Sequence, residues 1–216
     1  PDLHGDFGRS VEVLSAAGLI DASTLAWTGG NATLVQTGDI VDRGDDGKRI
    51  YELFFRLAEE APLQGGAVVN LLGNHELFNI RGDLRYVSDG DFEAFGGAQQ
   101  REMAWSRDGW LGQKVRGFRA THVVGGVLFV HAGLLPRFLE GGRRLSDINA
   151  DMAAALTQDG RPPEAALEDL LGDEGPVWTR VYAAKREQKA ICDAAKRALQ
   201  LAGAFRMVVG HTIQET

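Results

Sequence analysis

Four short runs of apolar and β-branched residues recur along the chain, and each run ends on a small or polar cluster. They lie at residues 33–37, 67–72, 127–130 and 206–209, and the clusters that follow are GDIVDRG, GNHE, HAG and GHT. Short continuous apolar runs are typical of strands buried on both faces. Open α/β sheets bind ligands in the loops at the carboxyl ends of their strands. The pattern therefore predicts four strands with functional loops at their carboxyl ends.

Between these runs, apolar residues repeat with the period of an α-helix. The apolar positions of residues 50–57 lie at i, i+3, i+4 and i+7, and residues 191–202 hold a second pattern of this kind. Strands that alternate with helices of this length predict an α/β domain in which helices cover layered sheets.

Two stretches, residues 82–126 and 134–180, fit this alternation poorly. The first is rich in glycine and aromatic residues, and the second contains QDGRPPEAALEDLLGDEGPVW. We interpret both as insertions over one face of a single domain that spans residues 1–216. Because loops vary while the scaffold stays fixed, such insertions often carry substrate selectivity.

Composition and charge narrow the class of protein. Of the 216 residues 44% are hydrophobic and 25% charged, and no run approaches the roughly 18 apolar residues of a membrane span. The net charge of −7 argues against a nucleic-acid partner, since such domains usually carry a basic face. Cys192 is the single cysteine, so no intrachain disulfide can form, and a reducing compartment is compatible with the sequence. We expect a cytoplasmic protein that binds neither nucleic acid nor membrane.

Histidine is scarce, and its placement is the strongest sign of chemistry in the chain. His4, His75, His131 and His211 lie in glycine- or aspartate-flanked clusters, and all but the first of them follow a predicted strand, whereas His122 does not fit this pattern. A single histidine is more often a surface or hydrogen-bonded core residue than a ligand. Four in such positions favour a shared site.

The clusters also supply oxygen ligands. GDIVDRG by itself would fit a solvated acidic turn equally well, and NH alone is a weak turn signal. Together, however, the clusters offer Asp, His, Asp, Asn, His and His, a set without thiolate that suits manganese, iron or zinc. Six protein ligands exceed what one catalytic metal needs if it keeps an open position, and two metals that share one carboxylate account for all six.

The five segments DLHGD, GDIVDRG, GNHE, HAG and GHT, in this order, resemble the calcineurin-like metallophosphoesterases, specifically their phosphoprotein phosphatase branch. The segments LLGNHELFNIRGDLRYV and GPVWTR are similar to those of the Shewanella-like phosphatases. The resemblance implies a layered α/β/β/α sandwich of mixed sheets with helices outside. It also implies two divalent or trivalent metal ions, with manganese favoured over iron or zinc.

The resemblance assigns the metal ligands by position. The first motif supplies Asp2 and His4 to one metal, and Asp39 bridges both metals. The remaining ligands correspond to Asn74, His131 and His211. Asp6 is not a ligand in this assignment and is expected to support the loop.

The resemblance also implies the catalytic and substrate-binding residues. His75, paired with Asp42, corresponds to the general acid, because a carboxylate orients the imidazole and stabilises its protonated form. Arg43 and Arg180, together with Asn74, are expected to bind the substrate phosphate, and the planar guanidinium can hold two phosphate oxygens. The implied reaction is in-line attack on phosphorus by a hydroxide that bridges the two metals, without a phosphoenzyme.

The sequence departs from the family pattern in two respects. Leu72 stands where mainstream Ser/Thr phosphatases have an arginine, so phosphotyrosine stays open beside phosphoserine and phosphothreonine in a protein or peptide substrate. The strand that precedes the first motif and the strand that follows GHT are missing, so we expect a chain truncated at both termini.

A dinucleoside-polyphosphate hydrolase and a phosphate-binding pseudo-enzyme are the alternative functions, and the oligomeric state is open.

Overall fold

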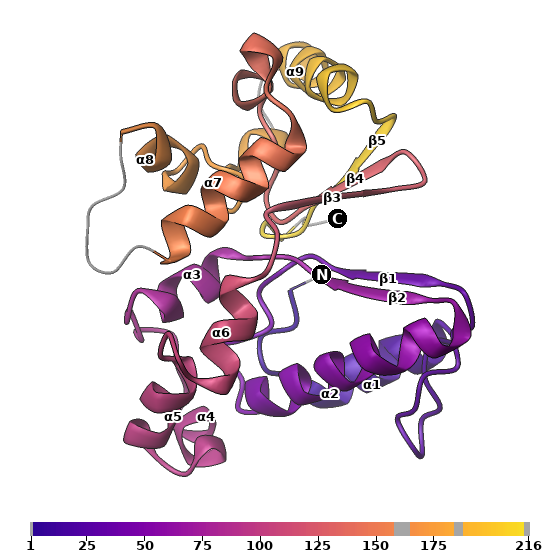
Figure 1. Cartoon of the computed structure of the whole chain (residues 1–216), viewed down its shortest axis with the longest axis vertical. Helices are drawn as coiled ribbons and strands as arrows, with labels where there is room; N and C mark the ends of the chain where they lie inside the picture. The colour runs from indigo at the N-terminus through magenta and orange to yellow at the C-terminus, as the bar shows by residue number, and fades with distance from the viewer. Residues whose placement is uncertain (1, 158–164, 184–187, 214–216) are drawn as a thin grey trace.

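Two small β-sheets form the centre of the structure, and helices lie outside them (Figure 1). The computed structural model describes residues 2–157, 165–183 and 188–213. The described helices and strands are α1 (Phe7–Ala16), β1 (Thr33–Gln36), α2 (Gly47–Glu60), β2 (Ala67–Asn70), α3 (Asn74–Ile80), α4 (Asp89–Phe95), α5 (Ala98–Trp105), α6 (Trp110–Arg116), β3 (Thr121–Val124), β4 (Val127–Val130), α7 (Leu145–Thr157), α8 (Ala165–Leu171), α9 (Gln188–Ala202) and β5 (Arg206–Val208). Short 3-10 helices occupy Ala61–Gln64, Pro136–Phe138, Glu140–Gly142 and Val181–Ala183.

The two sheets differ in strand direction. Strands β1 and β2 pair in parallel, with Leu34 opposite Val68. In the other sheet, β4 pairs antiparallel with β3 and parallel with β5. A parallel bridge between Leu71 and Arg119 lies between the end of β2 and the start of β3. Among the described residues, the first sheet is therefore parallel and the second mixed.

Helices cover the outer faces of the sheets, as the alternating pattern predicted. Helices α1 and α2 lie below β1 and β2 in Figure 1, and α9 lies above β5. The predicted apolar face of α2 is buried in the core, where Ile50 and Leu57 have no exposed surface. These contacts anchor the first sheet, so that the loops at its carboxyl end are held in place.

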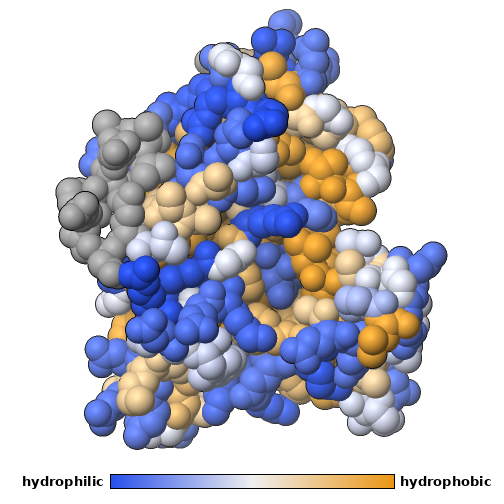
Figure 2. Space-filling model, in the orientation of Figure 1, coloured by the Kyte–Doolittle hydropathy of each residue, from blue (hydrophilic) through white to orange (hydrophobic). Residues whose placement is uncertain are grey.

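The strands are less buried than their apolar sequences predicted. All four residues of β2 are half-buried, and Thr33 and Arg206 are exposed at the starts of β1 and β5. In sheets of two and three strands most strands are edge strands, whose outer sides stay accessible. Figure 2 shows hydrophobic side chains gathered on the right of this face, beside the strands.

The stretch at residues 82–126, interpreted as an insertion, contains three helices and one strand of the sheet. Helices α4, α5 and α6 follow α3, and β3 then pairs with β4. The sequence did not predict β3. The stretch at residues 134–180 includes α7 and α8, and residues 158–164 of it lie outside the described residues. None of the described helices is both long and apolar enough to span a lipid bilayer.

Candidate metal centre

The loops after four strands converge on one cavity of about 530 Å³. Asp39 follows β1, Asn74 and His75 begin α3 after β2, and His131 and His211 follow β4 and β5. Eight of the ten predicted site residues line this cavity: Asp2, His4, Asp39, Arg43, Asn74, His75, Arg180 and His211. The other two, Asp42 and His131, lie directly behind it and contact His75 and Asn74. The structure thus brings together all ten residues.

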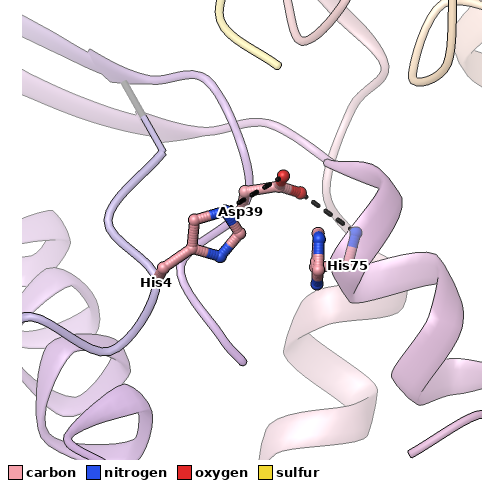
Figure 3. Close-up of side chains that lie close together, drawn as sticks. All are labelled: His4, Asp39 and His75. Atoms are coloured by element: carbon pink, nitrogen blue, oxygen red, sulfur yellow. Dashed lines mark hydrogen bonds and ion pairs between the residues drawn. The ribbon is translucent and has the colours of Figure 1, made fainter. Parts of the chain in front are cut away.

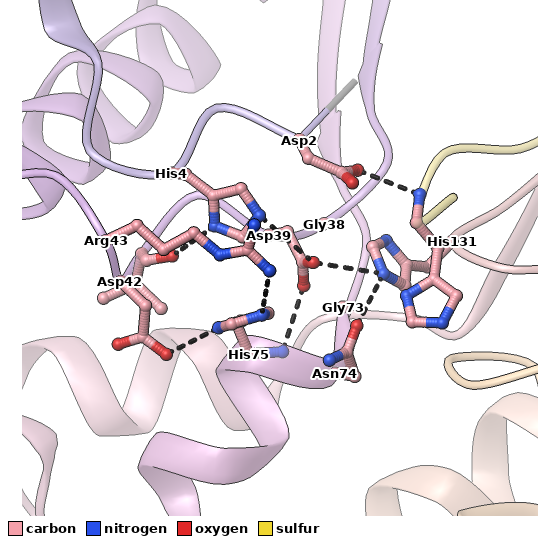
Figure 4. A network of polar contacts seen from close by, with 12 residues as sticks. Asp2, His4, Gly38, Asp39, Asp42, Arg43, Gly73, Asn74, His75 and His131 are labelled. Atoms are coloured by element: carbon pink, nitrogen blue, oxygen red, sulfur yellow. Dashed lines mark hydrogen bonds and ion pairs between the residues drawn. The ribbon is translucent and has the colours of Figure 1, made fainter. Parts of the chain in front are cut away.

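Asp39 lies at the middle of the site. Its side chain is 2% exposed, and Oδ1 accepts a hydrogen bond of 3.0 Å from the backbone N–H of His75. Oδ2 lies 3.8 Å from Nε2 of His4 and 3.4 Å from Nε2 of His131 (Figure 3 and Figure 4). The carboxylate therefore faces two imidazoles that come from separate loops.

These two imidazoles present the same nitrogen to Asp39. Nδ1 of His4 lies 3.0 Å from the carbonyl oxygen of Val41, and Nδ1 of His131 lies 2.8 Å from that of Thr37. Because a carbonyl oxygen only accepts hydrogen bonds, Nδ1 must carry the proton in both rings. In the neutral ring, Nε2 then carries a lone pair that faces the site, which is the arrangement that metal-binding histidines usually show.

Asn74 and His211 lie beside His131, on one side of the site. Oδ1 of Asn74 lies 2.9 Å from Nε2 of His131, and the rings of His131 and His211 are 5.1 Å apart. Nε2 of His211 is buried and has no hydrogen-bond partner among the described residues. An unpartnered buried nitrogen is costly in a folded protein, and a metal ion would satisfy it.

Two groups of residues could each hold one metal ion. Asp39, His131 and His211 form one group, and His4, Asp39 and His75 form the other, with ligand atoms within 4.8 Å of one another in each group. Asp39 belongs to both groups, as the predicted bridging role requires. The donor atoms fit manganese, iron or zinc, since all are carboxylate oxygens or imidazole nitrogens.

Asp2 lies at the edge of this arrangement. Its Oδ1 accepts a hydrogen bond of 3.1 Å from the backbone N–H of His211, so the first loop is joined to the loop after β5 (Figure 4). The backbone N–H groups of Leu3 and His4 donate to the carbonyl oxygen of Asp39. Asp6 caps α1 by accepting from the backbone N–H of Arg9, which fits the expected support of the loop.

His75 forms the most tightly held side-chain pair in the site. Its Nδ1 lies 2.7 Å from Oδ2 of Asp42, and both residues are at most 3% exposed. Its Nε2 lines the cavity 3.5 Å from Nη2 of Arg43. Arg180 also lines the cavity and donates to Oγ1 of Thr212.

Burial and charge set the protonation of the ligands. Burial, together with the charges of His131 and Arg180, lowers the pKa of His211 to about 4, so the ring is neutral at pH 7. Burial also lowers the pKa of His4. Burial would raise the pKa of Asp39, but the hydrogen bond and charge of His131 outweigh it, so that the pKa is about 2. Burial would lower the pKa of His131, but the hydrogen bond and charge of Asp39 raise it. Because metals bind the deprotonated imidazole nitrogen, a metal ion here would displace a proton from this ring.

Several residues of the site have a positive φ angle, a backbone conformation that non-glycine residues rarely adopt. Six described non-glycine residues have a positive φ, and five of them belong to the site: His4, Asp39, Asp42, Arg43 and His211. Such conformations cost free energy and persist where the surrounding structure enforces them, often at functional sites. No feature of the sequence predicted them.

Glu76 is the site residue that sequence reasoning missed most clearly. It is fully buried, and Oε2 accepts from the backbone N–H groups of Asp39 and Gly73, each at 2.8 Å. Oε1 accepts from the N–H of Ile40 and the hydroxyl of Tyr51. The sequence signal for Glu76 was its place in the GNHE cluster beside the predicted ligands. A carboxylate buried at such a place needs hydrogen-bond donors around it.

An aromatic wall closes one side of the cavity. Phe78 lies between Tyr86 and Trp178, with ring centroids 5.5 and 5.1 Å from its own. Tyr86 also contacts His75, at a centroid distance of 5.1 Å. These residues lie in the segments LLGNHELFNIRGDLRYV and GPVWTR, from which no role was predicted for them.

Comparisons with known proteins agree with this geometry. The model of the calcineurin-like phosphoesterase family matches residues 1–213, so the chain belongs to this family. It is 37% identical to an uncharacterized protein of Schizosaccharomyces pombe and 32% identical to Shewanella-like protein phosphatase 2 of Arabidopsis thaliana. Both matches cover 99% of this chain and 65% of the relative.

A solved structure confirms the predicted fold. The cold-active protein-tyrosine phosphatase of a psychrophilic Shewanella species superposes with a TM-score of 0.86 at 29% identity, over 99% of this chain and 64% of that one. The chain thus spans just under two thirds of the length of these proteins. The predicted resemblance to Shewanella-like phosphatases is confirmed, and membership of the family supports a metal-dependent phosphatase.

Proposed function

We propose that this protein is a dinuclear metal-dependent phosphatase that hydrolyses phosphomonoesters of a phosphorylated protein or peptide. The observation that carries the proposal is the position of Asp39 in both groups of potential metal ligands. One carboxylate between two sets of imidazole nitrogens suits a pair of ions, for which manganese is the favoured identity. Two ions of this kind supply an activated water and neutralise charge on the phosphoryl group.

The protein's own residues then bind the phosphate and deliver a proton. Arg43 and Arg180 both line the cavity, where each guanidinium can donate to phosphate oxygens. Asn74, which also lines the cavity, can donate through its amide nitrogen while its oxygen faces Nε2 of His131. His75, held by Asp42, is proposed to protonate the leaving oxygen through Nε2.

His75 could instead be a ligand of the first metal, since it belongs to one of the two groups. Two contacts favour the acid role. Nδ1 is held by Asp42, which leaves Nε2 as the only nitrogen that faces the cavity, and Nε2 lies 3.5 Å from a guanidinium nitrogen of Arg43. A cation beside Nε2 opposes a metal ion there but suits a ring that acts on an anionic substrate.

Among phosphomonoesters, we infer that aryl phosphates such as phosphotyrosine are preferred. The wall of Phe78, Tyr86 and Trp178 offers flat apolar surface beside the arginines. Stacked or edge-to-face contacts with a phenyl ring are worth about 0.5–1.5 kcal/mol each. The similar Shewanella protein is a protein-tyrosine phosphatase, which points the same way.

A substrate panel tests this function. The manganese-loaded full-length protein is assayed with phosphotyrosine and phosphoserine peptides of one sequence and with diadenosine tetraphosphate. We expect the highest kcat/KM for the phosphotyrosine peptide. Faster cleavage of the dinucleotide would identify a dinucleoside-polyphosphate hydrolase, and binding of phosphate without turnover on any substrate would identify a pseudo-enzyme.

A pair of tryptophan variants isolates the aromatic wall. Trp178→Ala removes one wall residue, whereas Trp110→Ala removes a 40% exposed tryptophan that does not line the cavity. The first should lower the preference for phosphotyrosine over phosphoserine by about 2- to 10-fold, as expected for the loss of one ring contact. The second should leave the preference unchanged. An unchanged preference in Trp178→Ala would contradict the role of the wall.

A further inference from the structure

A chain of buried polar contacts leads from His75 away from the cavity. Oδ2 of Asp42 is paired with His75, and Oδ1 accepts a hydrogen bond of 2.9 Å from Nδ2 of Asn79. Oδ1 of Asn79 accepts a hydrogen bond of 2.7 Å from Nη2 of Arg101. Nε of Arg101 donates to Oδ2 of Asp91, also at 2.7 Å. Each of these five residues is at most 4% exposed.

Arg101 is an unusual residue to find in this position. Its guanidinium is buried among Phe92, Phe95 and Trp105, with ring centroids 5.4–5.6 Å from the central carbon. Removing a charge from water costs several kcal/mol, and the ion pair with Asp91 offsets that cost only if the geometry is good. An apolar residue could fill the same space at lower cost, so stability alone does not account for this arginine.

The contacts of Arg101 fix the orientation of Asn79. A guanidinium can only donate hydrogen bonds, so the amide oxygen of Asn79 has to face Arg101. The amide nitrogen then has to face Asp42, and it also donates to the backbone carbonyl of His75 at 2.9 Å. Asn79 therefore holds both the partner and the backbone of His75.

The orientation of Asn79 in turn fixes the carboxylate of Asp42. Each oxygen of this carboxylate has one directional contact, Oδ1 with Asn79 and Oδ2 with His75. A carboxylate held through one oxygen only could rotate about its last bond and turn the imidazole with it. The second contact prevents this rotation, so that Nε2 of His75 keeps its direction into the cavity.

We propose that Arg101 and Asn79 are positioning residues for His75 and that they act through Asp42. The proposal rests on the proposed function, because it assumes that His75 protonates the leaving group. The residues come from three helices, with Asn79 on α3, Asp91 on α4 and Arg101 on α5. Part of the stretch at residues 82–126 thus helps to orient His75, in addition to any role in substrate selectivity.

The test compares two leaving groups on the manganese-loaded full-length protein. Phenyl phosphate needs a proton on its leaving oxygen, whereas 2,4-dinitrophenyl phosphate does not. In Asn79→Ala we expect kcat to fall about 10-fold with phenyl phosphate, the lower end of the effect of lost supporting contacts at a site. With 2,4-dinitrophenyl phosphate the fall should be less than about 2-fold, because proton donation contributes little there.

Two further variants keep the test decisive. Arg101→Lys preserves the charge beside Asp91 but cannot contact both of its present partners, so it should shift the ratio of the two rates in the same direction. It also decides the outcome if Asn79→Ala does not fold. Trp105→Phe is the matched control, since it alters the packing around Arg101 without removing any of the hydrogen bonds between His75 and Asp91. It should leave the ratio unchanged.

The ratio of the two rates does not depend on how much protein carries metal, so partial metal loss cannot imitate the effect. Equal losses on both substrates in Asn79→Ala and Arg101→Lys, or no loss on either, would overturn the positioning role. If the wild-type protein hydrolyses both substrates, that result leaves the proposed function intact. A wild-type protein that hydrolyses neither would overturn the proposed function, and the positioning role with it.

Discussion

Replacing Glu76 with glutamine should destabilise the protein and loosen the loop that carries Asp39. The carboxylate of Glu76 accepts four hydrogen bonds, three from backbone N–H groups and one from the hydroxyl of Tyr51. Glutamine keeps one oxygen, which can still accept from Asp39 and Gly73. Its amide group then faces the N–H of Ile40 and the hydroxyl of Tyr51.

The magnitude follows from these contacts. The hydroxyl of Tyr51 can rotate and accept from the new amide, but the N–H of Ile40 stays unpaired in the interior, at a cost of about 1–3 kcal/mol. The two remaining bonds lose their charged acceptor and weaken. Burial and the charge of Asp39 raise the pKa of Glu76, which makes the loss of its charge less costly. We therefore expect the free energy of unfolding to fall by about 2–4 kcal/mol.

Urea denaturation of the two proteins measures this difference. The midpoint should fall with an unchanged slope, and the melting temperature should drop by roughly 5–15 °C for a chain of this size. Tyr51→Phe is the matched control, because it removes one donor and leaves the carboxylate with three, and it should cost about 0.5–1.5 kcal/mol. The reasoning is refuted if Glu76→Gln unfolds within 1 kcal/mol of the wild type, a limit on the order of one ordinary hydrogen bond.

Three further predictions follow from the site. Asp39→Asn should lose both metal ions together when metal content is measured by mass spectrometry, and retention of one ion would show that Asp39 is not a bridge. His75→Ala should keep both ions but lower kcat for phenyl phosphate by roughly 10²–10⁴, whereas a loss of metal would identify His75 as a ligand. Chelation with EDTA should lower the melting temperature by about 5–10 °C, reversed by Mn²⁺, if the ions are present at about a hundred times their Kd; an unchanged melting temperature would argue against a structural contribution of the metals.

Much of the site could be predicted because its residues directly follow strands. The apolar runs before Asp39, Asn74 and His131 end at the loops that carry these side chains, so strand position alone predicts that they meet. Asp42 and Arg43 follow within the same loop as Asp39. The positions of the strands thus predict where the site lies, although they do not predict its geometry.

The parts that could not be predicted depend on contacts between distant segments. Arg101 is one polar residue of several in the short helix α5, and only its burial against Asn79 and Asp91 distinguishes it. The positive φ values of the site come from loops held on several sides, which no single segment encodes.

The missed strand β3 shows a related limit. Its four residues pair with β4, but the sequence around them did not alternate with a helical pattern as the other strands do. The aromatic wall was missed for the same reason as Arg101, because Phe78, Tyr86 and Trp178 lie far apart or in irregular segments and meet only in the fold.

Anomalous X-ray diffraction from crystals of the manganese-loaded full-length protein tests the central claim most directly. The claim is that Asp39 lies between two metal ions. The account predicts two anomalous peaks about 3.5–4 Å apart on either side of the Asp39 carboxylate, one near His4 and the other near His131 and His211. A single peak, or two peaks of which only one lies within bonding distance of Asp39, would contradict it.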